Sequence, residues 1–159
     1  MEWRKMRRFK QALSEEECIA ILKNEPRGVL SMHGENGYPY GIPVDFYYDE
    51  EDGKIYFHGA KTGNKNDLLK ADNKVCLTVM DKGFRKENEW ALNIKSVIAF
   101  GRIEVLDDHE RVLEQVRKIG RKYYPDEAYM EAEVTKAGNV VNILVMTIDH
   151  MTGKLVNES

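Results

Sequence analysis

Several features that would assign this chain to a specialised class are scarce or missing. Its 159 residues include two cysteines, and neither belongs to a CxxC pair or to a His/Cys cluster with zinc spacing. No apolar stretch is long enough to span a membrane, and the first residues lack the apolar segment of a signal peptide. We therefore expect no metal site, no membrane association and no disulfide framework. We interpret Cys18 and Cys76 as buried thiols of a cytoplasmic protein.

An excess of positive charge is also missing. The chain carries 24 Lys and Arg against 27 Asp and Glu, which gives a formal net charge of −3 and a pI near 5.9. Residues 1–10 are locally basic, but the acidic run "SEEEC" follows at once. Because nucleic-acid-binding domains usually carry a basic face, we expect no nucleic-acid partner. The length and the 42% of hydrophobic residues suit one domain, residues 1–159, with its own core.

Helical segments are indicated by caps and by apolar spacing. Ser14 and Glu17 have the spacing of a capping box, which predicts a helix that ends near Pro26. Apolar residues recur at helical spacing over 107–124, with Asp107 or Asp108 as the cap. We expect that helix to end at Pro125, and we expect shorter helices over 64–71 and over 126–137, the last ended by Gly138.

Short β-rich segments account for most of the remaining chain. Asn36-Gly37 and Asp52-Gly53 are strong hairpin signals, because these residues tolerate a positive φ angle. The connections are too short for parallel crossovers, and the polar stretch 82–93 reads as a loop. We therefore predict a mainly β protein with flanking helices (α+β), built on a closed or nearly closed antiparallel barrel. The predicted strands are 28–33, 38–49, 54–59, 73–81, 96–106 and 139–155.

The junction "IYFHGAKTGNKNDLL" (55–69) carries the first functional signal. A strand with Ile55 and Phe57 on its core face ends at His58, and glycines and a helix start follow. Free N–H groups at a helix start attract anions, and glycine lets a ligand approach the backbone. Lys65 in the first turn costs roughly 0.3–1 kcal/mol against the helix dipole unless an anion lies between them. The segment therefore predicts a phosphate site, to which Lys61 could contribute.

Structural explanations for the same residues stay open at this point. Asn64 and Asp67 have nearly the spacing of a capping box, so "GNKND" could be a well-capped helix start. Pro43 interrupts an alternating strand, which indicates either a sheet edge or a place where a ligand meets the backbone. Asp45 and Tyr47 on one strand and Tyr56 and His58 on the next could surround a flat ligand. They could equally form a solvated barrel exterior.

The order of these segments resembles a known family. The chain resembles the FMN-binding split β-barrel proteins related to pyridoxamine 5′-phosphate oxidase, and among them most closely the nitroimidazole-resistance group. Each matching segment is modest alone, and their order and spacing make the resemblance specific. The segments are "MRRFKQALSEEECIAIL" (6–22), "GVLSM" (28–32), "GIPVDFYYD" (41–49), 55–69, "VCLTVMD" (75–81), "SVIAFGRIEVLDD" (96–108) and "IDHMTGK" (148–154).

The resemblance implies a homodimer with FMN bound at the subunit interface. It implies that one strand lies along the isoalloxazine ring, that the 55–69 segment holds the ribityl-phosphate arm and that a later strand supplies a hydrogen-bond donor. His58 would lie near the flavin as a proton donor or an orienting group, since an imidazole can change protonation near neutral pH. The implied cofactor-binding residues are Pro43, Val44, Asp45 and Phe46, then His58, Gly59, Ala60, Lys61, Gly63, Asn64 and Lys65, and finally Ser96.

The resemblance further implies a reductase of a small-molecule substrate. FMN reduced by NAD(P)H or another donor would pass electrons to an electron-poor acceptor such as a nitroimidazole. Two departures affect the substrate: the 82–93 loop with Trp90 matches no family pattern, and the arginines expected for vitamin B6 oxidation are too few. The alternatives are a flavin-storage or redox-sensing protein without turnover, or a related barrel that binds haem or deazaflavin.

Overall fold

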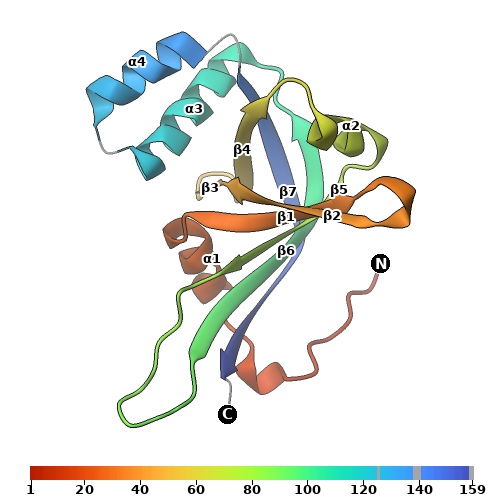
Figure 1. Cartoon of the computed structure of the whole chain (residues 1–159), viewed down its shortest axis with the longest axis vertical. Helices are drawn as coiled ribbons and strands as arrows, with labels where there is room; N and C mark the ends of the chain where they lie inside the picture. The colour runs from red at the N-terminus through yellow and green to blue at the C-terminus, as the bar shows by residue number, and fades with distance from the viewer. Residues whose placement is uncertain (125, 138–140, 158–159) are drawn as a thin grey trace.

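In the computed structural model, which describes residues 1–124, 126–137 and 141–157, seven strands form one antiparallel sheet (Figure 1). The strand order across the sheet is β2-β1-β5-β6-β7-β4-β3. No helix in these described ranges is long and apolar enough to cross a membrane. The strands are β1 (Arg27–His33), β2 (Pro39–Asp45), β3 (Tyr47–Asp49), β4 (Lys54–Ala60), β5 (Lys74–Met80), β6 (Asn93–Val105) and β7 (Val141–Asn157). The helices are η1 (Phe9–Gln11), α1 (Glu15–Asn24), η2 (Glu35–Gly37), α2 (Asn64–Ala71), α3 (His109–Tyr123) and α4 (Glu127–Ala137).

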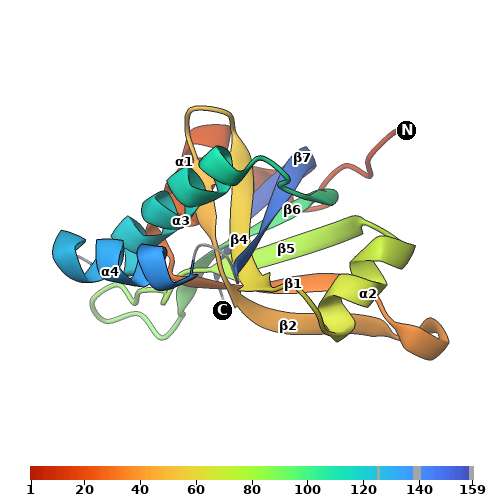
Figure 2. The ribbon, with the colours of Figure 1, turned by 90° about the horizontal axis from the view of Figure 1, so that it is seen from above.

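The sheet curls because its two edge strands are joined by a single residue. β2 and β3 lie at opposite edges of the strand order, yet only Phe46 separates them in the chain. The two edges must therefore meet at Phe46, which closes the sheet into a half-barrel there (Figures 1 and 2). The antiparallel barrel with flanking helices that we expected from the sequence is confirmed. The predicted continuous strand 38–49 is instead broken at Phe46, where the chain passes from one edge to the other.

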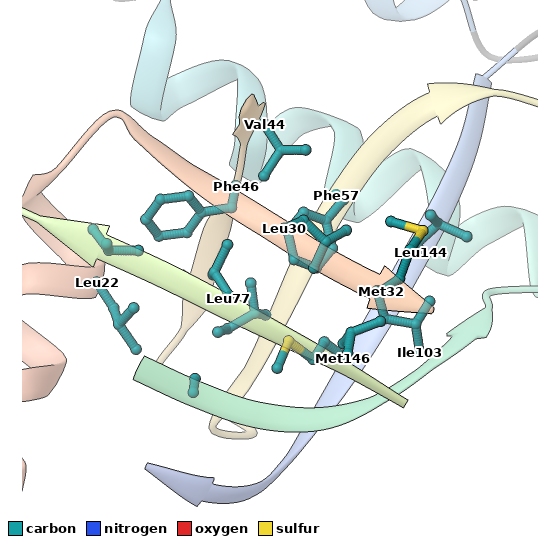
Figure 3. Close-up of a cluster of buried hydrophobic side chains, with 14 of the residues drawn as sticks. Leu22, Leu30, Met32, Val44, Phe46, Phe57, Leu77, Ile103, Leu144 and Met146 are labelled. Atoms are coloured by element: carbon teal, nitrogen blue, oxygen red, sulfur yellow. The ribbon is translucent and has the colours of Figure 1, made fainter. Parts of the chain in front are cut away.

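The barrel interior is filled by the inward-facing residues of its strands. Leu30, Phe57, Leu77 and Met146 come from four different strands and are at most 1% exposed, and they contact one another in the core (Figure 3). Side chains from α1 and α2 join the same cluster. Period-2 alternation on β1 and β5 produces this arrangement, since every second residue faces inward. The helix residues of the cluster are Cys18, Ile21 and Leu22 on α1 and Leu68 and Leu69 on α2.

Helix α3 covers the outer face of β4 and β7. Its apolar residues Val112 and Ile119 pack against Tyr56, Ile143 and Val145, which form a second cluster. The predicted free face of β4 is therefore wrong for Tyr56, which is 0% exposed beneath α3. Its hydroxyl donates a hydrogen bond to Asp52.

The far side of α3 is fixed to β3 through one buried carboxylate. Asp49 is 3% exposed and accepts hydrogen bonds from the Gln115 amide at 3.0 Å and the Lys118 ammonium at 2.9 Å. Such hydrogen bonds compensate the cost of burying the charge. They hold α3 in register over the short strand β3, so the helix position is set by polar contacts as well as by its apolar stripe.

Most element predictions from the sequence are confirmed. The Ser14–Glu17 capping box forms, the helix over 64–71 has the predicted bounds, and Asp108 caps α3. Asn36 and Gly37 adopt positive φ angles in the predicted turn. Both cysteines are free, but Cys76 is only partly buried, so the prediction of two buried thiols is correct for Cys18 alone. The predicted helix ends at Pro125 and Gly138 and the start of the last strand at 139 lie outside the described residues.

Candidate functional site

The closed end of the barrel is held by the last turn of α3. Phe46 lies between two strands, so its backbone groups lack ladder partners there. The Tyr123 hydroxyl accepts a hydrogen bond from the Phe46 N–H at 3.0 Å and lies 2.9 Å from the Phe46 carbonyl. The Lys122 ammonium donates to the same carbonyl at 2.9 Å and lies 3.9 Å from the centroid of the Phe46 ring. All polar groups of this residue are thereby satisfied, which is what a buried chain crossing requires.

The opposite end of the same strands is open. β3 and β4 pair in a register that ends at Tyr47↔Tyr56. Continuing that register would place Asp45 opposite His58 and Pro43 opposite Ala60, but there the chain of β2 pairs with β1 instead. Residues 43–45 and 58–60 therefore face one another as two edges without a ladder between them. We call this region the β2/β4 split. It brings together the two segments that the sequence predicts to hold the ring and the phosphate arm.

Helix α2 begins beside the split without a side-chain cap. Its N-cap is Gly63, whose φ angle of 130° favours glycine, and no side chain accepts a hydrogen bond from the first turn. The alternative that Asn64 and Asp67 form a capping box is therefore wrong. The helix is tied to the end of β4 by the buried Asn66, whose amide donates to the Ala60 carbonyl at 2.9 Å. This bond fixes the helix start against the strand end and leaves its first amides uncapped by side chains.

Lys65 in this first turn folds back over the strand. A Cβ atom added to Gly59 would lie 3.0 Å from the Lys65 Nζ, so the ammonium rests where a side chain would otherwise be. Burial lowers the pKa of Lys65. The ammonium forms no hydrogen bond or ion pair with any residue that the structure describes. A partly buried cation without a partner, next to uncapped amides, is the arrangement expected of a site that receives an anion.

On the β2 side of the split, Asp45 has an unsatisfied oxygen. Its Oδ1 is buried and accepts no hydrogen bond from the described residues, and Arg27 Nη1 approaches it at 3.4 Å. Arg27 is the cross-strand partner of Asp45 on β1. Pro43 lies on the edge strand β2, and an edge strand is where a sheet tolerates a proline. The edge-strand explanation of Pro43 is thus confirmed, and its position at the split is compatible with a ligand.

The other predicted residues divide into accessible and buried groups. His58 and Ala60 are exposed at the end of β4, as are Lys61, Gly63 and Asn64 in the following turn. Val44 and Phe46 are instead 9% and 0% exposed, with their side chains in the core (Figure 3). The side chains of β2 that remain accessible at the split are those of Pro43 and Asp45.

Ser96 is not brought to the split within its own chain. His58 on β4 pairs with Ile143 on β7. The Ile143 carbonyl accepts a hydrogen bond from the N–H of Leu106, just after β6, so Leu106 lies across β7 from His58. Ser96 lies ten residues earlier, which corresponds to about 30 Å of extended strand. It belongs instead to the outer face of β5 and β6, with Met80 as its cross-strand partner. This face also carries the exposed apolar side chains of Val29 and Ile98.

Two larger cavities lie away from the split. One of about 680 Å³ lies on the outer face of β1, β5 and β6, and one of about 620 Å³ lies between the N-terminal segment and β7. Within the described residues, no group of three or more His, Cys, Asp or Glu side chains is placed to hold a metal ion.

Sequence reasoning missed three residues that shape this region. Arg27, Lys122 and Tyr123 contact Asp45 or Phe46, and none was a candidate. The hairpin signal at 36–37 could have found Arg27, because a turn there places residues 27 and 45 opposite one another. Lys122 and Tyr123 end the apolar stripe of a helix, and its docking site cannot be read from local spacing.

Comparison with known proteins agrees with this fold. The family model of pyridoxamine 5′-phosphate oxidase matches residues 14–155. No curated protein matches the sequence. A candidate 5-nitroimidazole antibiotic resistance protein of Bacteroides thetaiotaomicron superposes with a TM-score of 0.78 at 22% identity, covering 92% of this chain and 87% of that one.

Two further solved structures share the fold. The flavocytochrome Anf3 of Azotobacter vinelandii gives a TM-score of 0.75 at 24% identity, over 96% of this chain and 72% of that one. An FAD-binding protein of Mesorhizobium loti gives 0.66 at 22% identity, over 92% and 97%. At these identities the structural likeness establishes the split-barrel architecture alone.

Proposed function

We propose, from the premise that this chain belongs to the pyridoxamine 5′-phosphate oxidase family, that it is a flavoprotein that binds FMN in the β2/β4 split. The observation that carries this proposal is the Lys65 ammonium, partly buried over the Gly59 backbone at an uncapped helix start. An anion between that cation and the first α2 amides would satisfy both. The phosphate of FMN is such an anion, and Lys61 lies in the same turn.

The β2 side of the split suits the ring of the cofactor. The Asp45 carboxylate is partly exposed, and its Oδ1 has an ion pair with Arg27 at 3.4 Å but no hydrogen bond. The imide N–H of a flavin is a donor that a carboxylate at this position can accept. The strand Pro43–Phe46 would lie along the ring through its backbone and the side chains of Pro43 and Asp45. The unsatisfied groups on both sides of the split therefore fit a flavin mononucleotide.

We propose that the protein reduces small electron-poor acceptors, with nitroaromatic compounds such as 5-nitroimidazoles as the leading class. Bound FMN supplies electron transfer from NAD(P)H or another donor, and the chain supplies binding and orientation. His58 is exposed at the strand end, where the extended register would place it opposite Asp45. It is placed to orient an acceptor or to supply a proton. The resemblance to a candidate nitroimidazole-resistance protein supports this substrate class.

The site is proposed to be completed in a homodimer. The outer face of β1, β5 and β6 exposes Val29, Met80 and Ile98 to 42%, 57% and 36%. Val29 and Ile98 both pair with Thr78, so they lie in one row across the sheet. Exposed apolar side chains in register favour burial against a second copy. Ser96 lies on the same face, far from the split of its own chain, and would reach the flavin of the partner.

Extraction of the pigment provides the first test. The purified protein should be yellow, with a flavin spectrum, and mass spectrometry of the extracted cofactor should give FMN. If the extracted cofactor is FAD, the proposed cofactor changes from FMN to FAD. If it is a deazaflavin or haem, the alternative of a related barrel that binds one of these cofactors is favoured. A colourless protein that does not bind added FMN would contradict the proposal.

The second test concerns the phosphate. Lys65→Ala should weaken FMN binding by roughly 10- to 100-fold, because a charge-assisted hydrogen bond is worth about 1.5–3 kcal/mol. Lys70→Ala is the matched control, because Lys70 is exposed in the last turn of the same helix. Both variants should unfold at the temperature of the wild type. Equal affinities of the two variants in a fluorescence titration would refute the phosphate placement.

Turnover separates an enzyme from a flavin store or sensor. Anaerobic mixing with NADH or NADPH should reduce the bound FMN, and a nitroaromatic acceptor should reoxidise it. His58→Ala should lower that turnover more than it lowers flavin retention. Failure of the bound FMN to be reduced at a useful rate would favour the storage or sensing role, and loss of flavin from His58→Ala would make His58 a cofactor anchor.

A further inference from the structure

Arg27 lies on the β2 side of the split and points to the same face as Asp45. The two residues are cross-strand partners, and such partners share a face of the sheet. Asp45 points away from the core, because its neighbours Val44 and Phe46 point into it. Arg27 therefore also points outward, and its side chain is 69% exposed.

The guanidinium of Arg27 has hydrogen-bond donors to spare. Its Nη1 lies 3.4 Å from the Asp45 Oδ1, and no described residue accepts a hydrogen bond from this side chain. An arginine side chain carries five N–H donors in a planar fork. Because neighbouring strands lie about 4.8 Å apart, the contact with Asp45 requires the guanidinium to extend from β1 over the edge strand β2. It can therefore donate to a ligand at that edge while it stays beside Asp45.

Lys122 is another cation whose charge interacts with Asp45, but it is already engaged. The charges of Asp45 and Glu25 both oppose the burial that lowers the pKa of Lys122. Its ammonium donates to the Phe46 carbonyl at 2.9 Å and lies over the ring of the same residue. Of these two cations near Asp45, Arg27 is the one with donors available to a ligand.

The Arg27–Asp45 pair complements the edge of an imide. An imide presents one N–H donor between two carbonyl acceptors, and the pyrimidine ring of a flavin has such an edge. A carboxylate beside a guanidinium offers the opposite pattern, an acceptor next to donors. The side chain of Asp45 is 26% exposed, so both members of the pair are accessible.

We propose that Arg27, together with Asp45, binds the pyrimidine edge of FMN and raises the reduction potential of the cofactor. This inference rests on the proposed binding of FMN in the β2/β4 split. Reduction adds negative charge to the flavin ring, and a cation close to that ring favours the reduced form. Without Arg27, the charge of Asp45 would face the reduced ring uncompensated. Arg27 thus sets how readily the bound FMN accepts electrons.

The reduction potential of bound FMN tests this role. The protein, in excess over FMN, is reduced anaerobically with dithionite beside a reference dye of known potential. Arg27→Gln should lower the preference for reduced over oxidised FMN by about three- to tenfold, as expected for loss of a partly exposed charge contact. For a two-electron couple this is a fall of about 14–30 mV. Arg27→Lys keeps the charge, so its potential should lie closer to that of the wild type.

Arg117→Gln is the matched control, because Arg117 on α3 pairs with Glu131 on α4 rather than with a residue of the split. Its FMN should have the wild-type potential. A change of less than about twofold in Arg27→Gln, or about 9 mV, would overturn this inference and leave the proposed FMN site standing. An equal fall in Arg117→Gln would also overturn it, because the effect would then follow net charge. A protein that binds no FMN would contradict the proposed function and this inference together.

Discussion

The two ends of the strand pair that closes the barrel differ in how their polar groups are satisfied. At the closed end, the Phe46 N–H donates a hydrogen bond to the Tyr123 hydroxyl, and the Phe46 carbonyl accepts one from the Lys122 ammonium. At the split end, the Lys65 ammonium and the Asp45 Oδ1 have no hydrogen bonds to described residues. Buried polar groups normally have hydrogen-bond partners within the protein. We therefore interpret the closed end as structural and the split as a ligand-binding site.

This difference teaches that unsatisfied groups locate a site better than residue type does. Lysines and aromatic residues occur at both ends, and Lys122 is more firmly held than Lys65. Burial lowers the pKa of Lys122 to about 8, although the charges of Asp45 and Glu25 oppose this shift. Its ammonium donates to the Phe46 carbonyl and lies over the Phe46 ring. Lys65 has burial without such contacts. Its partner is therefore expected from outside the chain.

The largest effect is expected from Phe46→Ala. Phe46 is 0% exposed, so truncating it should lower the free energy of unfolding by about 3–5 kcal/mol. Pro43→Ala, three residues earlier on the exposed edge, should change it by less than about 0.5 kcal/mol. Urea unfolding of both variants measures this contrast. Similar losses of unfolding free energy in the two variants would contradict the distinction between a structural closed end and a ligand-binding split.

Tyr123→Phe should have the next largest effect. Without the hydroxyl, the Phe46 N–H has no acceptor, which should cost about 1–3 kcal/mol of unfolding free energy. FMN affinity of the folded protein should stay at the wild-type value, because the change lies at the closed end. Tyr129→Phe, at an exposed position on α4, is the control. A loss of FMN affinity in Tyr123→Phe without loss of stability would mean that the closed end binds the cofactor and is not merely structural.

Gly59→Ala should weaken FMN binding by about fivefold with little loss of stability. The new Cβ would meet the Lys65 Nζ at 3.0 Å and displace a flexible ammonium rather than backbone. Gly101→Ala provides the contrast, since its Cβ would meet the Thr147 carbonyl oxygen in the barrel wall. That clash should cost about 1–3 kcal/mol of stability. A destabilised Gly59→Ala with normal FMN affinity would argue against Lys65 as the phosphate ligand.

The last prediction concerns pH. Burial raises the pKa of Tyr123 from 10.0 to about 12. Between those values the unfolded chain loses this proton and the folded chain keeps it, so stability falls as the pH rises through this window. Below about pH 10 both states are protonated and the contribution is complete. Tyr123→Phe should therefore show a shallower loss of stability between pH 10 and 12, as measured by urea unfolding. If the slope of unfolding free energy against pH is the same in Tyr123→Phe and the wild type, the Tyr123 hydroxyl is not buried with a raised pKa.

Local signals in the sequence predicted the elements well because their causes are local. The Ser14–Glu17 box, the Asn36-Gly37 turn and the apolar stripe of α3 depend on neighbours within a few residues. The break at Phe46 could not be predicted, since apolar alternation continues through it and only barrel closure explains it.

At the site, the sequence predicted the junction but not how its residues are used. His58, Gly59 and Lys65 do lie together at the end of β4. Asn64 is not part of a cap because Gly63, with its positive φ angle, takes the N-cap position. Tyr56 is buried because α3 docks over it. Both follow from tertiary packing, which residue spacing does not contain.

A crystal structure of the protein soaked with FMN tests the central claim most directly. The account predicts the phosphate within about 3 Å of the Lys65 Nζ and the first amides of α2, with the ring along Pro43 and Asp45 of the same split. An FMN phosphate bound at another place on the chain, with Lys65 still unpartnered over Gly59, would contradict it.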